Sequence, residues 1–252
     1  GAGLCIVEAT AVQSEGRISD ADLGLWNDQQ MEQIKTLRHN LKSISPMPFA
    51  VQLAHAGRKA STDKPWLGKG QIAPDQTRGW QTVSASDIPF QAHEHPPQAL
   101  TIEEIQQVIA DFAASAKRAV NAEFDLIELH AAHGYLLHQF MSPLSNQRQD
   151  DYGGSLDNRI RLTLDVFKAM KAAVPQDYPI GVRLSATDWM DEVNGWDVES
   201  TVYLSKALEA LGAVYIHVSS GGLHAEQAIE IHPNYQVPFA AAVKQAVKIP
   251  VI

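Results

Sequence analysis

The chain has 252 residues, of which 45% are hydrophobic and 19% charged, and these values suit one globular domain large enough for an enzyme. Its formal charge of −9, with no cluster of Lys or Arg, argues against a nucleic acid or an anionic membrane as partner. Cys5 is the only cysteine, which excludes an intrachain disulfide and is compatible with the cytoplasm. No apolar run is long enough to predict a membrane span.

Short apolar and β-branched runs predict strands at intervals along the chain. They lie at residues 4–12, 49–53, 126–130, 180–185 and 214–218, and a further run begins at 249–252. Apolar residues with helical spacing predict helices between them, near residues 31–41, 102–116, 160–167 and 204–211. Thr101 and Glu104 form a capping box at the second helix, and Ser155 is the predicted N-cap of the third.

Residues 57–100 interrupt this alternation. They hold five prolines and two tryptophans, and no helical stripe. A connection of this length is usually an active-site lid or an excursion over a binding site. We therefore predict a long lid loop over residues 57–100.

Strands that alternate with helices predict an α/β fold with a parallel sheet, either doubly wound or closed as a (β/α)₈ TIM barrel. Polar residues gather at or just after the carboxyl ends of several strands, where barrel enzymes build their sites: Gln52, His55, His130, Arg183 and residues 219–222. No GxGxxG follows the first strand, so support for a dinucleotide-binding doubly wound fold is missing. We therefore predict the barrel.

The stretch "ELHAAHGYLLHQFMSP" places His130, His133 and Tyr135 directly after a strand. From the residues alone, these side chains fit ordinary polar residues of a barrel rim, metal ligands at i and i+3, or a catalytic group. The metal interpretation predicts a hydrolase or lyase barrel that uses His55, His130, His133 and His217. A binding barrel without catalysis is a third alternative, and we assign His138 to the following helix as a structural residue.

Four segments together carry a resemblance to a known family. They are "VEATAV", "VQLAHAGRKA", "IELHAAHGYLLHQFMSPLSNQRQDDYGGSLDNR" and "GVRLSATD", at residues 7–12, 51–60, 127–159 and 181–188. Their order and spacing closely resemble the Old Yellow Enzyme family of flavin ene-reductases over nearly the whole chain. The paired histidines and "KASTDKPWLG" look most like its bacterial xenobiotic-reductase, thermophilic-like branch.

The resemblance implies an oxidoreductase that holds flavin mononucleotide (FMN) and takes hydride from NADPH or NADH. Its substrates would be enones, enals and related electrophilic alkenes, and the complete protein would be a homo-oligomer. Tyr135 matches the family's proton donor. His130 and His133 match the pair that binds and polarises the substrate carbonyl, and Trp66, in the long loop, is a candidate to line the substrate cavity.

Three further residues match positions of the family that contact the flavin: Ala9, Gln52 and Arg183. Arg183 would place positive charge near the flavin's N1 and O2, where the reduced ring is negative. Gln52 offers both a donor and an acceptor to the pyrimidine edge. From the residues alone, a rim salt bridge for Arg183 and a buried structural amide for Gln52 explain these residue types equally well.

The strand count predicts a partial barrel. Six strand signals are present where a closed barrel needs eight, and the resemblance aligns them with strands two to about seven. Barrel enzymes commonly hold a cofactor phosphate on the loops after strands seven and eight. We therefore expect residues 1–252 alone to bind FMN poorly and to show little activity.

Overall fold

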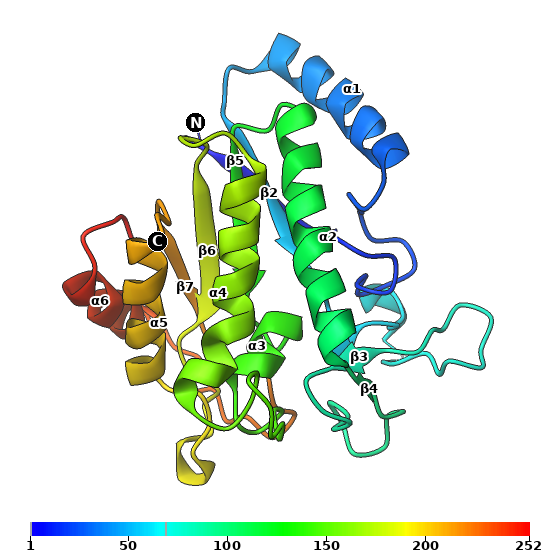
Figure 1. The fold of residues 1–252 in the computed structure, drawn as a ribbon, viewed down its shortest axis with the longest axis vertical. Coiled ribbons are helices and arrows are strands. Elements are labelled where there is room, and N and C mark those ends of the chain that lie inside the picture. Colours follow the sequence, from blue (N-terminus) through cyan, green and yellow to red (C-terminus); the bar gives the residue numbers. More distant parts are fainter. Residues whose placement is uncertain (1, 69) are drawn as a thin grey trace.

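The computed structural model describes residues 2–68 and 70–252, and its central element is a parallel sheet (Figure 1). The strands are β1 (Cys5–Ala11), β2 (Phe49–Ala54), β5 (Leu126–Ala131), β6 (Ile180–Ser185) and β7 (Ile216–Ser219), in the order β1-β2-β5-β6-β7. Five predicted strands are thus confirmed to within two residues at each end. The sixth is reduced to a single parallel bridge between Ile216 and Val251.

The predicted helices are confirmed as α1 (Asp28–Ile44), α2 (Ile102–Asn121), α4 (Leu156–Ala173) and α5 (Val198–Ala210). The capping box of Thr101 and Glu104 begins α2, and Ser155 caps α4 by accepting from the Asn158 amide. The helix predicted around His138 is α3 (Leu136–Met141). None of the helices within the described residues is long and apolar enough to cross a membrane.

A sixth helix, α6 (Val237–Ala246), was not predicted. Its sequence "VPFAAAVKQA" consists largely of alanine and valine, and only Val243 is buried. A short helix with so little buried surface has no strong periodic pattern that separates it from a loop.

The two faces of the sheet differ in polarity. The helix-facing side of β5 presents Ile127 and Leu129, both fully buried in a core shared with Phe112 of α2 and Phe167 of α4. The alternate positions on the other face are polar and include Glu128 and His130. In Figure 1, α2, α4 and α5 lie along one side of the sheet, so the polar side chains lie on the side away from them.

A contact between distant strands shows that the sheet is strongly curved. Arg183 Nη1 on β6 lies 2.6 Å from Glu8 Oε1 on β1, although β2 and β5 lie between them. In a flat sheet these strands would be about 14 Å apart, with side chains perpendicular to the sheet. The sheet therefore curls with its polar face inward, as in a (β/α)₈ barrel, and it does not close among the described residues.

Residues 57–100 form an excursion at the carboxyl ends of the strands, next to α3 (Figure 1). The elements within the described residues 57–68 and 70–100 are short: the 3₁₀ turns Gly57–Lys59 and Pro65–Leu67, and the paired strands β3 (Val83–Ser84) and β4 (Gln98–Ala99). Arg58 anchors this excursion, because its guanidinium donates to the carbonyls of Ile88, Pro89 and Leu223. Whether it acts as a lid remains a prediction.

Candidate active site

The end of β5 and the residues that follow it form a tight turn (residues 130–135), which we call the catalytic turn after the role predicted for its side chains. His133 and Gly134 both have left-handed backbones, with φ of 58° and 72°. A Cβ on Gly134 would lie 2.1 Å from the Gly222 carbonyl oxygen, and one on Gly222 would lie 2.5 Å from the His133 carbonyl group. Two glycines thus let the loops after β5 and β7 meet backbone to backbone.

Every backbone N–H from residue 132 to residue 136 has an acceptor. In chain order the acceptors are His130 Nδ1, Ser185 Oγ, His138 Nδ1, the Ala132 carbonyl and the His55 carbonyl. Side chains and backbone from β2, β5, β6 and α3 therefore fix this turn. Such support is needed, because a left-handed residue other than glycine costs about 1–3 kcal/mol and persists only where its surroundings impose it.

The turn brings the three predicted catalytic side chains together. The ring centroid of His130 lies 5.1 Å from that of His133 and 4.9 Å from that of Tyr135, both pairs edge to face. Tyr135 is the N-cap of α3, yet its side chain makes no capping hydrogen bond. Among the described residues its hydroxyl has no hydrogen-bond partner, and so it is free for a ligand.

The protonation states of these groups suit them as neutral donors. Burial lowers the pKa of His130 well below its usual 6.5, and the neighbouring His133 and Arg183 lower it further. Burial, with Arg183 second, lowers the pKa of His133 to about 3. Burial raises the pKa of Tyr135 to about 12. At neutral pH the site therefore presents two uncharged imidazoles and a protonated phenol.

The tautomer of His130 follows from its contacts. Its Nδ1 accepts from the Ala132 amide at 3.2 Å, so the ring proton is on Nε2, which has no partner among the described residues. His133 Nε2 lies 2.7 Å from Ser219 Oγ on β7. That contact orients the His133 ring and leaves its Nδ1 without a partner among the same residues.

Lys59 is a site residue that the sequence patterns did not single out. Its Nζ donates to the carbonyls of His133 and Gly222, both at 2.8 Å, and lies 5.3 Å from the centroid of the Tyr135 ring. Burial, and then the neighbouring Arg58, lower its pKa to about 8. Its position in "HAGRKA", directly after a strand end, was the available signal.

The flavin-contact candidates lie on the same inner face as the catalytic turn. Arg183 pairs with His130 across β6 and β5, and Gln52 pairs with Glu128 across β2 and β5. Ala9 lies in a bulge of β1, where Glu8 and Ala9 together oppose Gln52. The backbone of Ala9 is therefore released from regular pairing, and its side chain lines a small pocket with Tyr135.

Glu128 organises a second polar cluster deeper in the sheet. Its carboxylate accepts from Gln52 Nε2 at 2.7 Å, Tyr215 Oη at 2.8 Å and His217 Nδ1 at 3.0 Å. Burial alone would raise the pKa of Glu128, but hydrogen bonds from His217, Gln52 and Tyr215 outweigh it, so the pKa is lowered. Glu128 is therefore a carboxylate held by three donors.

Two expectations from the sequence receive no support from the placement of the residues. Trp66 lies on the 3₁₀ turn Pro65–Leu67 with 79% of its surface exposed, so it is not brought to the catalytic turn. His55 and His217 do not form a metal cluster with the histidine pair, because His55 Nδ1 accepts from the Gly57 amide and His217 binds Glu128. Among the described residues, no three His, Cys, Asp or Glu side chains are placed to hold a metal ion.

Comparison with known proteins now decides the family. The sequence pattern of the NADH:flavin oxidoreductase / NADH oxidase family matches residues 1–252. The chain belongs to this family. The resemblance to Old Yellow Enzyme is confirmed, and so is the barrel fold, since a solved old yellow enzyme homologue from Zymomonas mobilis superimposes with a TM-score of 0.76 at 25% identity, over 99% of this chain and 68% of that one.

Two relatives are similar to this chain over almost its full length. A NADH:flavin oxidoreductase of Gibberella zeae is 48% identical over 98% of this chain and 63% of its own length. A NADPH dehydrogenase of Listeria monocytogenes is 44% identical over 97% of this chain and 66% of its own length. The chain thus spans less than two thirds of each relative.

Family membership implies a flavin, and the predicted contact residues fit one. Gln52 Oε1 is buried and has no hydrogen-bond partner, although Nε2 of the same amide is bound to Glu128. Arg183 Nε is likewise buried without a partner. Orphaned buried polar atoms are rare in native proteins. An acceptor at Gln52 and a donor at Arg183, on the inner face that carries His130, match what the polar edge of a flavin ring requires.

Proposed function

We propose that the protein is an NAD(P)H-dependent flavin ene-reductase that reduces the activated C=C bond of α,β-unsaturated carbonyl compounds. One observation carries this proposal. The rings of His130 and Tyr135 stand edge to face with their centroids 4.9 Å apart, and among the described residues the His130 Nε2–H and the Tyr135 hydroxyl have no partner. The same polar face presents the orphaned atoms of Gln52 and Arg183. Donors for an oxyanion, a proton source and flavin contacts thus share one site.

The histidines would bind and polarise the carbonyl group of the substrate. When bound, FMN reduced by NADPH or NADH supplies the hydride that the β-carbon of the alkene receives. Negative charge then develops on the carbonyl oxygen, and preorganised N–H donors stabilise it. His130 Nε2–H is such a donor, and the rigid turn holds it in place without reorganisation. Both imidazoles are neutral, and a neutral imidazole carries one N–H group. Each ring can therefore donate one hydrogen bond.

Tyr135 would complete the reduction by giving its proton to the α-carbon. Its pKa of about 12 keeps the phenol protonated at neutral pH, while an α-carbon that carries enolate character is basic enough to take the proton. Lys59, 5.3 Å from the ring centroid, is placed to stabilise the phenolate that remains. The products are the saturated carbonyl compound and a tyrosinate that regains its proton from solvent.

Four finer expectations belong to the same proposal. They are a preference for NADPH, membership of the xenobiotic-reductase branch, action in the cytoplasm and assembly into a homo-oligomer. The name of the Listeria relative supports NADPH as donor. The excursion of residues 57–100 would act as a lid over the site, which is consistent with its position at the carboxyl ends of the strands.

The test is a spectrum and a turnover assay on the purified full-length protein. We expect flavin absorbance bands with about one FMN per chain, and oxidation of NADPH that depends on an added enone such as cyclohexenone. Flavin-free protein, or flavin protein that oxidises NADPH at the same rate with and without any enone or enal, would contradict the proposal.

A further inference from the structure

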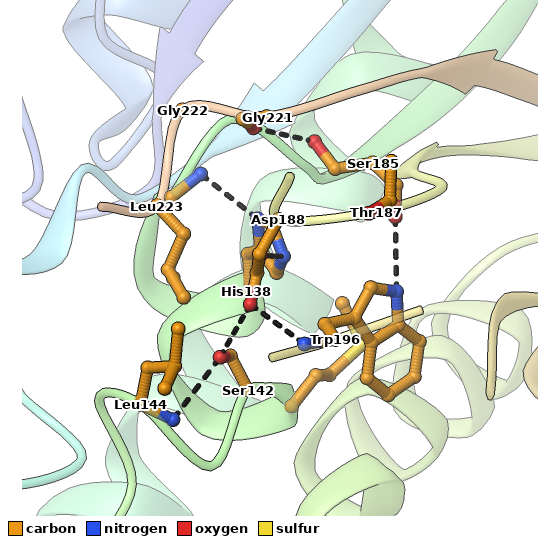
Figure 2. Close-up of polar contacts among 12 residues, drawn as sticks. His138, Ser142, Leu144, Ser185, Thr187, Asp188, Trp196, Gly221, Gly222 and Leu223 are labelled. Carbon is orange, nitrogen blue, oxygen red and sulfur yellow. Dashed lines mark hydrogen bonds and ion pairs between the residues drawn. The ribbon is translucent and has the colours of Figure 1, made fainter. Parts of the chain in front are cut away.

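A buried polar cluster lies behind the catalytic turn, and the proposed reaction does not use it (Figure 2). We call it the Asp188 cluster: His138, Ser142, Asp188 and Trp196. The side chains of His138 and Asp188 are fully buried, and Trp196 is 1% exposed. A buried carboxylate next to an imidazole is costly unless its partners are well placed, so the contacts of each atom are informative.

The contacts of Asp188 place a proton on His138. Asp188 Oδ2 accepts from Ser142 Oγ at 2.6 Å and from the Trp196 amide at 2.8 Å. Asp188 Oδ1 lies 2.9 Å from His138 Nε2, an ion-pair distance, but the two atoms do not align as a hydrogen bond, and both are buried without a hydrogen-bond partner among the described residues. The negative oxygen at this distance favours a proton on His138 Nε2, because an unprotonated nitrogen would place two acceptors against each other.

The other nitrogen of His138 binds the catalytic turn. The Gly134 amide donates to His138 Nδ1 at 2.9 Å. A backbone amide can only donate, so Nδ1 carries no proton. His138 is the third residue of α3, the position from which a side chain in a capping box reaches back to a backbone N–H. Here the His138 side chain accepts from the Gly134 N–H. The Tyr135 side chain is therefore not needed to cap the helix.

We propose that Asp188 and His138 are positioning residues for the reaction. Asp188 fixes the proton of His138 on Nε2, which leaves Nδ1 as the acceptor that holds Gly134 in its left-handed conformation. The turn in that conformation places His133 on one side of Gly134 and Tyr135 on the other. The inference rests on the proposed function, because it takes those two side chains as the groups that contact the substrate.

Asp188→Asn separates this role from simple core packing, because it changes hydrogen bonding without changing volume. Two donors, Ser142 and the Trp196 amide, face the Oδ2 position, so the asparagine oxygen takes that place and its NH₂ faces His138. The imidazole then moves its proton to Nδ1, where it opposes the Gly134 N–H. His138→Asn should rescue this variant, because the side-chain oxygen of asparagine occupies the place of Nδ1. That oxygen accepts from the Gly134 amide whether residue 188 is Asp or Asn.

The experiment uses the full-length protein with its flavin bound and four chains: wild type, Asp188→Asn, Asp188→Asn/His138→Asn, and Ser145→Ala. Ser145 is the matched control, since its buried hydroxyl bonds the Gln139 carbonyl at the end of α3 but touches neither His138 nor Asp188. Amide hydrogen exchange of residues 132–136 reports on the turn. Stopped-flow mixing of the reduced enzyme with cyclohexenone reports on alkene reduction. Mixing of the oxidised enzyme with NADPH reports on flavin reduction, which does not use the proton donor of the turn.

We expect Asp188→Asn to speed amide exchange in residues 132–136 and to slow alkene reduction about 10–100-fold, the usual effect of losing an outer partner of a site histidine. Reduction by NADPH should change little, and the double variant should recover most of the lost rate. Ser145→Ala should match wild type in both readouts. Unchanged exchange in Asp188→Asn, or a double variant no faster than Asp188→Asn, would overturn the proposal.

A measurement on wild type keeps the inference testable if Asp188→Asn does not fold. Nitrogen-15 NMR of the His138 side chain distinguishes its tautomers, and we expect a proton on Nε2 alone. A proton on Nδ1 would overturn the proposal. Neither this measurement nor the exchange experiment needs catalysis. A protein without ene-reductase activity would therefore contradict the proposed function, while both experiments would still test how Asp188 and His138 hold the turn.

Discussion

Two layers of polar side chains lie on the inner face of the same sheet, and they use their hydrogen-bonding groups in opposite ways. The Glu128 layer consists of Glu128 with Gln52, Tyr215 and His217, and its carboxylate accepts from all three partners. The catalytic layer consists of His130, His133 and Tyr135, where a ring N–H and a hydroxyl have no partner among the described residues. Two residues along β5 separate the layers.

The difference shows how a barrel interior divides scaffold from chemistry. In the Glu128 layer three donors bind one carboxylate, which holds these side chains in place. Gly181 makes this possible, because a Cβ there would lie 2.1 Å from the Tyr215 ring that crosses β6 to reach Glu128. In the catalytic layer the hydrogen bonds go to the backbone of the turn, which leaves the functional ends of His130 and Tyr135 free.

The largest expected effect comes from breaking the turn itself. Gly134→Ala would add a Cβ 2.1 Å from the Gly222 carbonyl oxygen at a residue with φ of 72°. Because both partners are backbone, we expect a loss of about 3–5 kcal/mol in the free energy of unfolding, in the range of severe core substitutions. Urea unfolding of the full-length protein measures it.

Gly154→Ala is the matched control for that substitution. Gly154 has a similar φ of 79°, but a Cβ there would meet nothing within 4 Å. It should therefore cost only the left-handed conformation, about 1–2 kcal/mol. Equal losses in the two variants would show that the close approach of the loops after β5 and β7 does not constrain the catalytic turn.

Glu128→Gln tests whether the Glu128 layer is scaffold. The amide oxygen of glutamine can keep the place of Oε2, which accepts from Tyr215 and His217, but the NH₂ in the place of Oε1 then faces the Gln52 NH₂. An unsatisfied buried polar group costs about 1–3 kcal/mol. We expect that loss of stability in thermal or urea unfolding, with alkene reduction by the folded protein slowed less than about tenfold. A loss of alkene-reduction rate beyond this limit in the folded protein would instead indicate that Glu128 takes part in the reaction.

The same variant has a pH signature. The folded-state pKa of Glu128 is lowered below its usual 4.5, so the carboxylate stabilises the fold above that pH and this contribution is lost as the pH falls. Wild type should therefore exceed Glu128→Gln in stability at neutral pH, and the gap should narrow below about pH 4.5. A gap that stays constant down to about pH 3 would contradict the assigned ionisation.

His133 should make the fold sensitive to mild acid. Its pKa is lowered from 6.5 to about 3, so the unfolded chain binds a proton that the folded chain does not over this window. Stability therefore falls as the pH falls from about 6.5, by up to about 1 kcal/mol per pH unit for this one group. His133→Asn should flatten the curve of unfolding free energy between about pH 7 and pH 5. Parallel curves for wild type and variant would contradict the shift.

The smallest expected effect concerns the contact that spans the curved sheet. Glu8→Gln removes the charge that faces Arg183, but the Glu8 side chain is 50% exposed. An exposed ion pair contributes about 0–1 kcal/mol, so the unfolding free energy should change by less than about 1 kcal/mol. A larger loss would mean that the pair, more than strand packing, maintains the curvature. Arg183→Gln provides the comparison, since it also removes a proposed flavin contact.

The sequence predicts the parts of this molecule that depend on local patterns. Neighbouring residues encode three such features. They are the capping box of Thr101 and Glu104, the apolar period of α2, and the cluster of His130, His133 and Tyr135 at the end of a strand. The strand ends followed from apolar runs bounded by polar residues. The family resemblance supplied the roles proposed for these three side chains, which the local pattern alone left open.

Features that depend on distant partners could not be predicted. Nothing near His138 indicates that Asp188, beyond another strand end, lies against its ring. The bulge at Ala9 depends on register with β2, and the place of Lys59 depends on the loop after β7. The place of Trp66 was equally open, because an aromatic residue in a long loop fits a cavity wall or an exposed position, and its side chain is exposed. Each case needs the packing of separate elements, which periodicity does not encode.

The most direct test of the account compares the two tyrosines of the two layers. In the full-length protein, Tyr135→Phe and Tyr215→Phe each remove one buried hydroxyl with a raised pKa, and stopped-flow mixing of the reduced enzyme with cyclohexenone measures the rate of alkene reduction. We predict that Tyr135→Phe slows this step about 10²–10⁴-fold, as expected for a lost general acid, and that Tyr215→Phe lowers stability but leaves the step nearly unchanged. Unchanged reduction in Tyr135→Phe, or an equal loss in Tyr215→Phe, would contradict the division into a catalytic layer and a scaffold layer.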